Sequence, residues 1–110
     1  MYLSSLILNL RINKTHPDCL HGSAELPQEI LEAAKLKQYQ AVTVFNSSRG
    51  GFADTYAVST DPKVVMTTGA MSSFAALNEI VNVAAFCISN HAGEEATTTY
   101  TNGCELIGRN

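Results

Sequence analysis

Short apolar runs separated by polar turns dominate the chain and predict a mainly β protein. The residues from Tyr2 to Ile12 are mostly apolar and predict a first strand, which leads into a polar loop over residues 13–21. Residues 41–46 and 52–59 predict two strands joined by the serine- and glycine-rich turn 47–51. These two strands are expected to form a hairpin.

The period of the apolar positions changes after Ser23. Apolar side chains recur at residues 26, 30, 31 and 34, which is the spacing of one helical face. Pro27 suits the first turn of a helix, where its missing N–H removes no hydrogen bond. We therefore expect one short amphipathic helix directly after Ser23.

The second half of the chain returns to short apolar segments. Val64–Thr68 predicts a strand stopped by Gly69, residues 71–78 predict one turn of helix, and Ile80–Ile88 predicts a strand buried on both faces. The polar residues after His91 predict an edge strand or a loose tail. Many short strands in one small core favour a closed β-barrel, because closure removes exposed strand edges.

Composition and charge narrow the class of protein. A chain of 110 residues is expected to be one domain over residues 1–110. The net charge is -3 and the lysines and arginines are scattered singly, so we expect no nucleic-acid partner. No leader-like start is seen, nor an apolar run near the roughly 20 residues of a membrane helix, so no membrane contact is expected. Three cysteines without C-x-x-C spacing are typical of a reducing cytoplasm.

The histidines and paired carboxylates do not predict a metal site. His16 and His21 lie in a loop, His91 is far away, and no Cys/His cluster occurs. Glu94 and Glu95 are adjacent and would point apart, as on a solvated surface. We therefore expect no bound metal.

The dipeptide Gly22-Ser23 has two interpretations. Gly-Ser is a common loop sequence, so taken alone it predicts a turn. A serine hydroxyl can also attack the preceding carbonyl to give an ester, and β-elimination and hydrolysis then leave a pyruvoyl group. Glycine before the serine favours this rearrangement, because it has no Cβ and tolerates strained backbone angles. The local sequence does not decide between the two.

Four segments in order resemble the pyruvoyl-dependent aspartate 1-decarboxylase family, self-processing enzymes that make β-alanine. The resemblance covers about residues 5–102. The segments are THPDCLHGSAELPQEILEAAKL, AVTVFNSSRGGFADTYAV, TTGAMSS and EIVNVAAFCISNHAGEEA.

The resemblance implies a small six-stranded double-psi β-barrel that forms a homotetramer with active sites between subunits. It implies cleavage between Gly22 and Ser23 into a β-chain, residues 1–22, and an α-chain, residues 23–110. The α-chain would begin with a pyruvoyl group made from Ser23, with neither metal nor pyridoxal phosphate. That group would form a Schiff base with an amino acid and accept electrons as carbon dioxide leaves, converting aspartate or a related substrate.

Further site residues are carried over from the same resemblance. Thr55 would hydrogen-bond the Gly22 carbonyl region during processing, and Tyr56 would reprotonate the decarboxylated carbon. Because successive strand residues face opposite sides, both roles require a local twist or subunits meeting there. Asn46 and the backbone of Gly69-Ala70 would line the same site.

The chain departs from the family pattern where substrate carboxylate is bound. Leu8 or Asn9 stands in place of the family's lysine, and Gly51 or Phe52 in place of its arginine. Arginine matters there because its planar fork binds a carboxylate through two hydrogen bonds. Thr68 replaces an asparagine, and the segment before Gly22 is one residue shorter.

Arg11 or Lys14 can replace the missing cation of the first strand, and Arg49 is the guanidinium nearest to the second position. The candidate substrate-binding residues are therefore Arg11, Arg49, Thr55, Thr68, Gly69 and Ala70.

Two other hypotheses stay open at this point. One is an unprocessed barrel that serves as a binding protein or a cofactor-free biosynthetic enzyme using Tyr56, and the loss of both cations favours it. The other is a domain without chemistry, in which Gly22-Ser23 only leads into a helix. The residues leave open the substrate, the pathway and any need for a maturation factor.

Overall fold

The computed structural model describes residues 1–88 and 95–110, which form a mixed β-sheet with two short helices. The predictions made for His91 and Glu94 lie outside the described residues. The elements in chain order are β1 (Tyr2–Arg11), β2 (Lys14–His16), β3 (Ser23–Pro27), α1 (Gln28–Ala33), β4 (Ala41–Asn46), β5 (Phe52–Thr60), β6 (Met66–Thr68), α2 (Met71–Phe74), β7 (Ile80–Cys87), β8 (Thr97–Gly103) and β9 (Glu105–Arg109).

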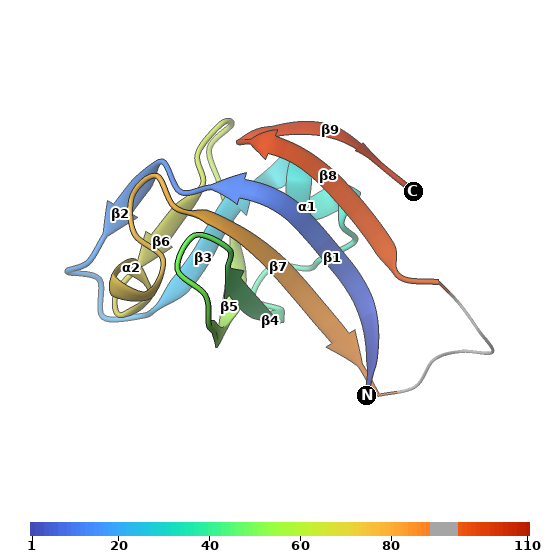
Figure 1. Ribbon diagram of the computed structural model, residues 1–110, viewed down its shortest axis with the longest axis horizontal. Helices are drawn as coiled ribbons and strands as arrows, with labels where there is room; N and C mark the ends of the chain where they lie inside the picture. The colour runs from blue at the N-terminus through green and yellow to red at the C-terminus, as the bar shows by residue number, and fades with distance from the viewer. Residues whose placement is uncertain (89–94) are drawn as a thin grey trace.

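The nine strands are hydrogen-bonded in the order β2-β6-β3-β5-β4-β7-β1-β8-β9. Three neighbouring pairs are parallel, namely β2 with β6, β3 with β5 and β1 with β8. Figure 1 shows β7, β1, β8 and β9 side by side, with β2, β6 and α2 at the other end of the molecule. The mainly β class is confirmed. In the described residues, however, the order ends in two edges, β2 and β9, so it is not the expected closed ring of six strands.

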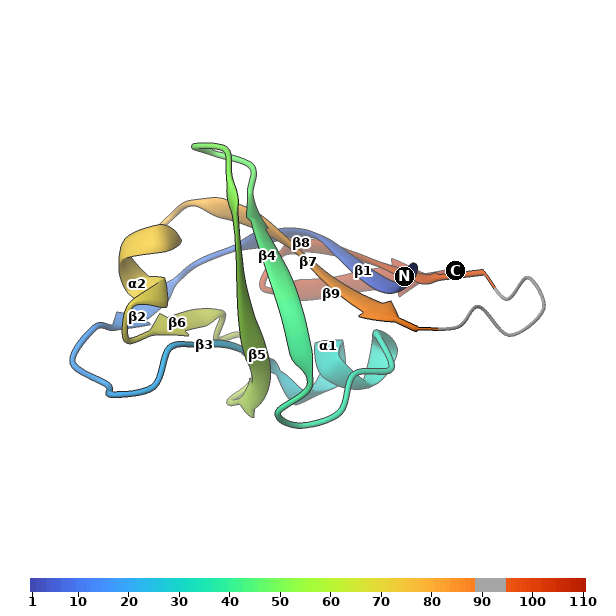
Figure 2. The ribbon, with the colours of Figure 1, turned by 90° about the horizontal axis from the view of Figure 1, so that it is seen from below.

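Three strands of the first half, β1, β4 and β5, agree closely with the prediction, whereas β2 lies within the segment 13–21 that was expected to be a loop. The first strand, Tyr2–Arg11, ends one residue earlier than expected. The hairpin of β4 and β5 is antiparallel, and its bounds differ from the prediction by a single residue at Thr60. Figure 2 shows this hairpin standing across the other strands, with α1 and α2 on separate parts of the molecule.

The prediction of a helix directly after Ser23 was wrong in its first part. Ser23–Pro27 forms β3, and the helix begins only at Gln28. β3 is paired on both edges, with β5 and with β6, so ladder hydrogen bonds hold this segment extended. Leu26, Ile30 and Leu31 are all buried, as their spacing predicted, but the first lies on a strand.

The end of the polar C-terminal segment is an edge strand, β9, as predicted, but the strand before it is not at an edge. β8 lies between β1 and β9, and alternate threonines, Thr97, Thr99 and Thr101, face the interior. The strand expected to be buried on both faces, β7, instead exposes Phe86 on its outer side. A central place in a sheet does not require both faces to be covered.

A bulge in β1 sets which side chains reach the core. The pairing of β1 shifts between Ile7 and Leu10, so both of these residues are fully buried although they lie three positions apart. Asn9 at the bulge has a φ of 71°, and its backbone N–H donates to Asn82 Oδ1 at 2.9 Å. The side chains of Ile7 and Leu10 join a core of buried aliphatic residues from β3, β4, β7 and α1.

The helices are short and lie against the strands. α1 contacts β3, β5 and β9, while α2 contacts β6. Within residues 1–88 and 95–110 we find no helix whose length and apolar content would let it cross a membrane.

Two buried threonines of β8 give opposite predictions for stability. Among the described residues the Thr99 hydroxyl has no hydrogen-bond partner, whereas the Thr101 hydroxyl donates to the Leu8 carbonyl at 2.8 Å. Thr99→Val removes an unsatisfied buried hydroxyl and should raise the free energy of unfolding by about 1 kcal/mol. Thr101→Val leaves a carbonyl unpaired and should lower it by about 1–2 kcal/mol. Equilibrium unfolding in urea measures both, and equal losses in the two variants would contradict the assignment.

Candidate active site

Ser23 lies at the start of a strand that is held from both sides. On one side it pairs with Thr68 of antiparallel β6, and on the other side its neighbour Ala24 pairs with Ala57 of parallel β5. The residue two before Ala57 on β5 is Thr55. The sheet therefore brings two threonines, one from each flanking strand, to the Gly22-Ser23 segment.

Both threonines hydrogen-bond the backbone around the Gly22-Ser23 peptide bond. Thr55 Oγ1 donates to the Gly22 carbonyl at 2.8 Å, and Thr68 Oγ1 donates to the His21 carbonyl at 2.8 Å. The Ser23 hydroxyl oxygen lies 2.7 Å from Thr68 Oγ1. Ser23 and Thr68 are 3% and 2% exposed, so the contact between their hydroxyls is shielded from water. The arrangement fixes two successive carbonyls and the serine hydroxyl together.

The close approach of backbone segments at this site is made possible by Gly69. Its φ is +58°, and its N–H donates to the His16 carbonyl at 3.0 Å. A Cβ at residue 69 would lie 2.9 Å from the carbonyl oxygens of Cys19 and His21. It would also lie 3.0 Å from the backbone nitrogen of Gly22. No side chain fits there without moving the segment that leads to Ser23.

Gly22 is less constrained than its place before the serine suggested. It does not have a positive φ, and an added Cβ would meet Met71 Cγ at 3.5 Å and the Thr68 carbonyl oxygen at 3.6 Å. These are ordinary van der Waals distances. The unusual backbone angle expected at Gly22 is found at Gly69 instead, on the strand end packed against it.

A carboxylate that the sequence did not single out also lies close to Ser23. Glu25 Oε2 is 3.5 Å from Ser23 Oγ, at the outer limit of a hydrogen bond. The two side chains share a face because residues two apart in a strand point the same way. The expected helix would have turned them apart, so only the correct strand assignment reveals this pair.

Tyr56 lines an open cavity of about 480 Å³ together with His21 and Tyr39. The rings of Tyr39 and Tyr56 are 6.2 Å apart between centroids. Thr55 and Tyr56 face opposite sides of β5, yet one contacts Gly22 and the other shares a cavity with the adjacent His21. The sequence did not point to Tyr39, because this residue lies in a loop and no motif adjoins it. Its φ is 66°, in the left-handed region.

Arg49 is fixed in the hairpin turn. Its Nε lies 2.6 Å from Glu79 Oε2, and its Nη2 donates to the carbonyls of Ser73 and Phe74 at 2.7 and 2.6 Å. The Ala76 N–H, together with Asn46 and Arg49, holds the pKa of the Glu79 carboxyl below its usual range despite partial burial. Three of the five N–H groups of the guanidinium are therefore engaged by internal acceptors.

Asn46, expected to line the site, is used in the same turn. Its Oδ1 accepts from the backbone N–H groups of Ser48 and Arg49, both at 3.0 Å. Its Nδ2 donates to Phe74 O at 2.9 Å and to Glu79 Oε1 at 3.2 Å. This network organises the turn between β4 and β5, and no hydrogen bond is seen from Asn46 to the Gly22-Ser23 segment in the described residues.

The other candidate substrate-binding residues are dispersed. Arg11 lies at the end of β1, where its Nη1 donates to the Asn78 carbonyl at 2.8 Å. Ala70 is exposed, directly before α2. Phe52, at the position of the family's arginine, is 66% exposed and packs against Phe45 with ring centroids 6.0 Å apart. As far as the described residues show, neither Arg11 nor Arg49 lines the cavity beside Tyr56.

Gly69→Ala tests the close approach at the site, with Gly50→Ala as a matched control. Gly50 also has a positive φ, +88°, but an added Cβ would meet nothing within 4 Å. In both variants the strained backbone conformation alone should lower the free energy of unfolding by about 1–2 kcal/mol. Gly69→Ala should lower the free energy of unfolding clearly more, because the segment at Cys19 and His21 must move. Urea unfolding measures the difference, and equal losses would contradict the required contact.

The sequence matches the model of one known protein family. The model of the aspartate decarboxylase family matches residues 1–102, which is nearly the whole chain. The match begins before β1 and runs into β8, of which it leaves out only the last residue, Gly103. The chain belongs to the aspartate decarboxylase family.

Proposed function

We propose that the chain cleaves itself between Gly22 and Ser23 and then decarboxylates an amino acid, aspartate or a related substrate. The observation that carries the proposal is the 2.8 Å hydrogen bond from Thr55 Oγ1 to the Gly22 carbonyl, next to a buried serine hydroxyl. Membership of the aspartate decarboxylase family supports the decarboxylation step.

In the first step the Ser23 oxygen adds to the Gly22 carbonyl carbon, and the C–N bond between the two residues breaks to give an ester. Negative charge develops on the Gly22 oxygen during this addition. Thr55 already donates to that oxygen, so it stabilises the charge without rearrangement. The Ser23 nitrogen leaves as an amine and takes up a proton.

The Ser23 hydroxyl must lose its proton as the bond forms. Thr68 has a single hydroxyl proton, so while it donates to the His21 carbonyl, the Ser23 hydroxyl donates to Thr68 Oγ1. When the Thr68 proton turns from the His21 carbonyl to Ser23 Oγ, the serine proton is free to point at Glu25 Oε2, 3.5 Å away. We propose that Glu25 accepts this proton as a general base.

The second step removes the Cα proton of residue 23 and breaks the Cβ–O bond of the ester. Gly22 is released with a carboxylate, and water converts the remaining dehydroalanine to a pyruvoyl group with loss of ammonia. The buried Ser23, held between two threonines, fits the formation of that group at the start of β3. The pyruvoyl group supplies an electron sink for loss of carbon dioxide.

The cavity beside Tyr56 is the proposed place for the substrate. It opens next to His21, the residue adjoining the cleavage point, and Tyr56 presents a phenol that can deliver a proton to the decarboxylated carbon. Its described lining holds no lysine or arginine. A second carboxylate of the substrate would therefore need a cation from another subunit of the proposed homotetramer.

The same lack of a cation favours a second candidate, an unprocessed barrel without a pyruvoyl group. Arg49 is occupied by Glu79 and two carbonyls, and Phe52 is apolar. The two candidates differ in covalent structure. Self-cleavage gives fragments of residues 1–22 and 23–110 and a carbonyl that reacts with hydroxylamine, whereas the second candidate gives one intact chain.

Glu25→Gln tests the proposed base, with Glu29→Gln on the exposed side of α1 as its control. Loss of a general base should slow cleavage by about 100-fold or more. The appearance of the two fragments is followed by mass spectrometry. Cleavage of Glu25→Gln at the rate of the control would exclude this role.

Substrate choice is measured separately, by carbon dioxide release from a panel of amino acids. The cleaved protein should release it from aspartate or a related amino acid, and Ser23→Ala should release none. Release by Ser23→Ala at the parent rate would favour the unprocessed alternative.

A further inference from the structure

We propose that β9 pairs with β9 of a second copy of this chain, antiparallel and centred on Ile107. β9 (Glu105–Arg109) is the last strand in the sheet order, so β8 pairs with one of its edges and no described strand pairs with the other. Figure 1 shows β9 at the rim of the molecule, beyond β8. The match to the family model ends at residue 102, before this strand, and no described residue of β9 lines the cavity beside Tyr56. The inference therefore goes beyond the proposed function.

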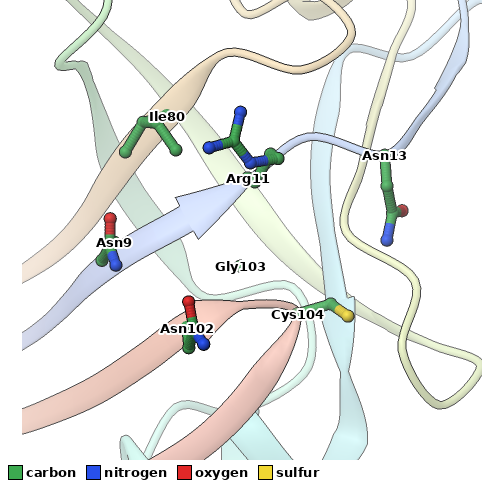
Figure 3. Close-up of a pocket in the computed structure, with 7 residues that line it drawn as sticks. All are labelled: Asn9, Arg11, Asn13, Ile80, Asn102, Gly103 and Cys104. Carbon is green, nitrogen blue, oxygen red and sulfur yellow. The ribbon is translucent and has the colours of Figure 1, made fainter.

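Both ends of β9 are fixed to the rest of the sheet. The turn that leads into it contains Gly103, which has a φ of +74° and pairs with Leu10 of β1. Figure 3 shows Gly103 and Cys104 in this turn, beside the end of β1. At the other end the backbone N–H of Asn110 donates to the Thr98 carbonyl at 3.1 Å, and Asn110 Oδ1 accepts from the Thr98 N–H at 2.9 Å. The open edge is thus held extended before any partner binds.

The two faces of β9 differ in exposure. Leu106 packs against the hydrophobic core, and α1 contacts the strand. Glu105, Ile107 and Arg109 point the other way and are exposed, Ile107 by 68%. An apolar residue exposed on an unpaired edge strand favours pairing with another chain. Ile107 therefore marks the place where a second strand would bury the most apolar surface.

The charges of β9 select one direction and one register. In an antiparallel pair centred on Ile107, Glu105 of each copy lies opposite Arg109 of the other, and the two Ile107 side chains face each other. Opposite charges and apolar side chains in directly opposed positions stabilise a strand pair. A parallel pair in register would place Glu105 beside Glu105 and Arg109 beside Arg109, which is destabilising. The strand therefore fits a second copy of itself, related by a twofold axis.

Both charges are available for such a contact. In the described part of the chain neither Glu105 nor Arg109 forms an ion pair. Arg109 Nη1 lies 3.5 Å from the Ala33 carbonyl, at the outer limit of a hydrogen bond. Because this contact is long and exposed, the guanidinium can exchange it for a carboxylate with little loss of stability.

The contact is expected to be weak and limited to two chains. A strand of five residues offers far less than the roughly 1,200–2,000 Å² that stable interfaces bury. The pairing of β8 with β9 also shifts between Tyr100 and Thr101, beside Ile107, and such a bulge twists the edge and limits the length of strand that it binds. A twofold pair uses the same edge of both copies, so no third chain can add there. Association should rise with protein concentration and weaken with salt.

Ile107→Cys tests the register, with Leu77→Cys as its control. Leu77 is also an exposed apolar residue, at 53%, but lies outside the strands. At the centre of the proposed pair the two introduced Cβ atoms would lie about 4.5–5.5 Å apart, which a small shift brings within reach of a disulfide. Under mild oxidation of the folded full chain, Ile107→Cys should cross-link to its second copy about tenfold faster than Leu77→Cys does, because pairing raises the local concentration of the two thiols. Peptide mass spectrometry identifies the linked residues, and equal rates would overturn the proposal.

Charge reversal in the Ile107→Cys chain tests the two ion pairs. Glu105→Arg alone or Arg109→Glu alone places like charges opposite each other and should slow cross-linking by about fivefold at low salt. The two single variants change the net charge in opposite directions, so a shared slowing does not come from net charge. Glu105→Arg combined with Arg109→Glu restores opposite charges and should recover the original rate. Equal slowing in the single and double variants, or no slowing in the single ones, would overturn the proposal.

The test does not depend on cleavage between Gly22 and Ser23. β9 lies in the intact chain and equally in the fragment of residues 23–110, so cross-linking can be read on either. A chain that stays intact but cross-links at residue 107 would contradict the proposed function and support the pairing of β9. A chain that cleaves but does not cross-link at residue 107 would overturn only the pairing of β9.

Discussion

Pairing of β3 on both of its edges is the constraint on which the candidate site depends. Because β3 lies between β5 and β6, Thr55 and Thr68 reach the carbonyls of Gly22 and His21 from opposite sides. Both hydrogen bonds are 2.8 Å long and partly buried, and they hold the peptide bond before Ser23 in one position. A turn at the surface, which the local sequence equally allowed, would not be held in this way.

The backbone freedom that the site needs is supplied by a residue distant in sequence from the serine. Gly69, at the end of β6, has the left-handed conformation and accepts close contact with three backbone atoms of the segment before Ser23. Gly22 itself does not have a positive φ, and an added Cβ would meet its neighbours at ordinary distances. The left-handed conformation of Gly69 thus lets the segment before Ser23 pack closely against β6. Glycine at position 22 has no side chain, so it leaves its own carbonyl open to the Ser23 hydroxyl.

Part of the fold could be predicted from apolar periodicity, because β4 buries alternate residues along its length and β1 buries Ser5 and Ile7 on one face. The start of the helix could not be predicted in this way. Residues 26, 30 and 31 are all buried, and this pattern is the same whether Leu26 lies on a strand or on the helix. The burial of alternate threonines in β8 could not be predicted either, because a run of threonines has the same polar composition in a sheet as in a solvated tail.

The candidate site was predictable only where sequence motifs carry it. Thr55 and the Gly22-Ser23 pair were named from the family resemblance, and the hydrogen bond between Thr55 and Gly22 is present in the structure. Glu25 and Tyr39 have no motif and depend on strand pairing and loop conformation. Arg49 was chosen for its charge, but pairwise contacts in the hairpin turn, which a sequence does not show, already occupy it.

The central claim is that Thr55 activates the Gly22 carbonyl for attack by Ser23. The most direct test is a time course of intact mass for freshly purified protein and for Thr55→Val, which keeps the shape of the side chain and removes the donor. The account predicts conversion of the parent chain into fragments of residues 1–22 and 23–110, slowed by about 100-fold or more in Thr55→Val. A parent chain that stays intact on prolonged warming, or equal rates in the two proteins, would contradict it.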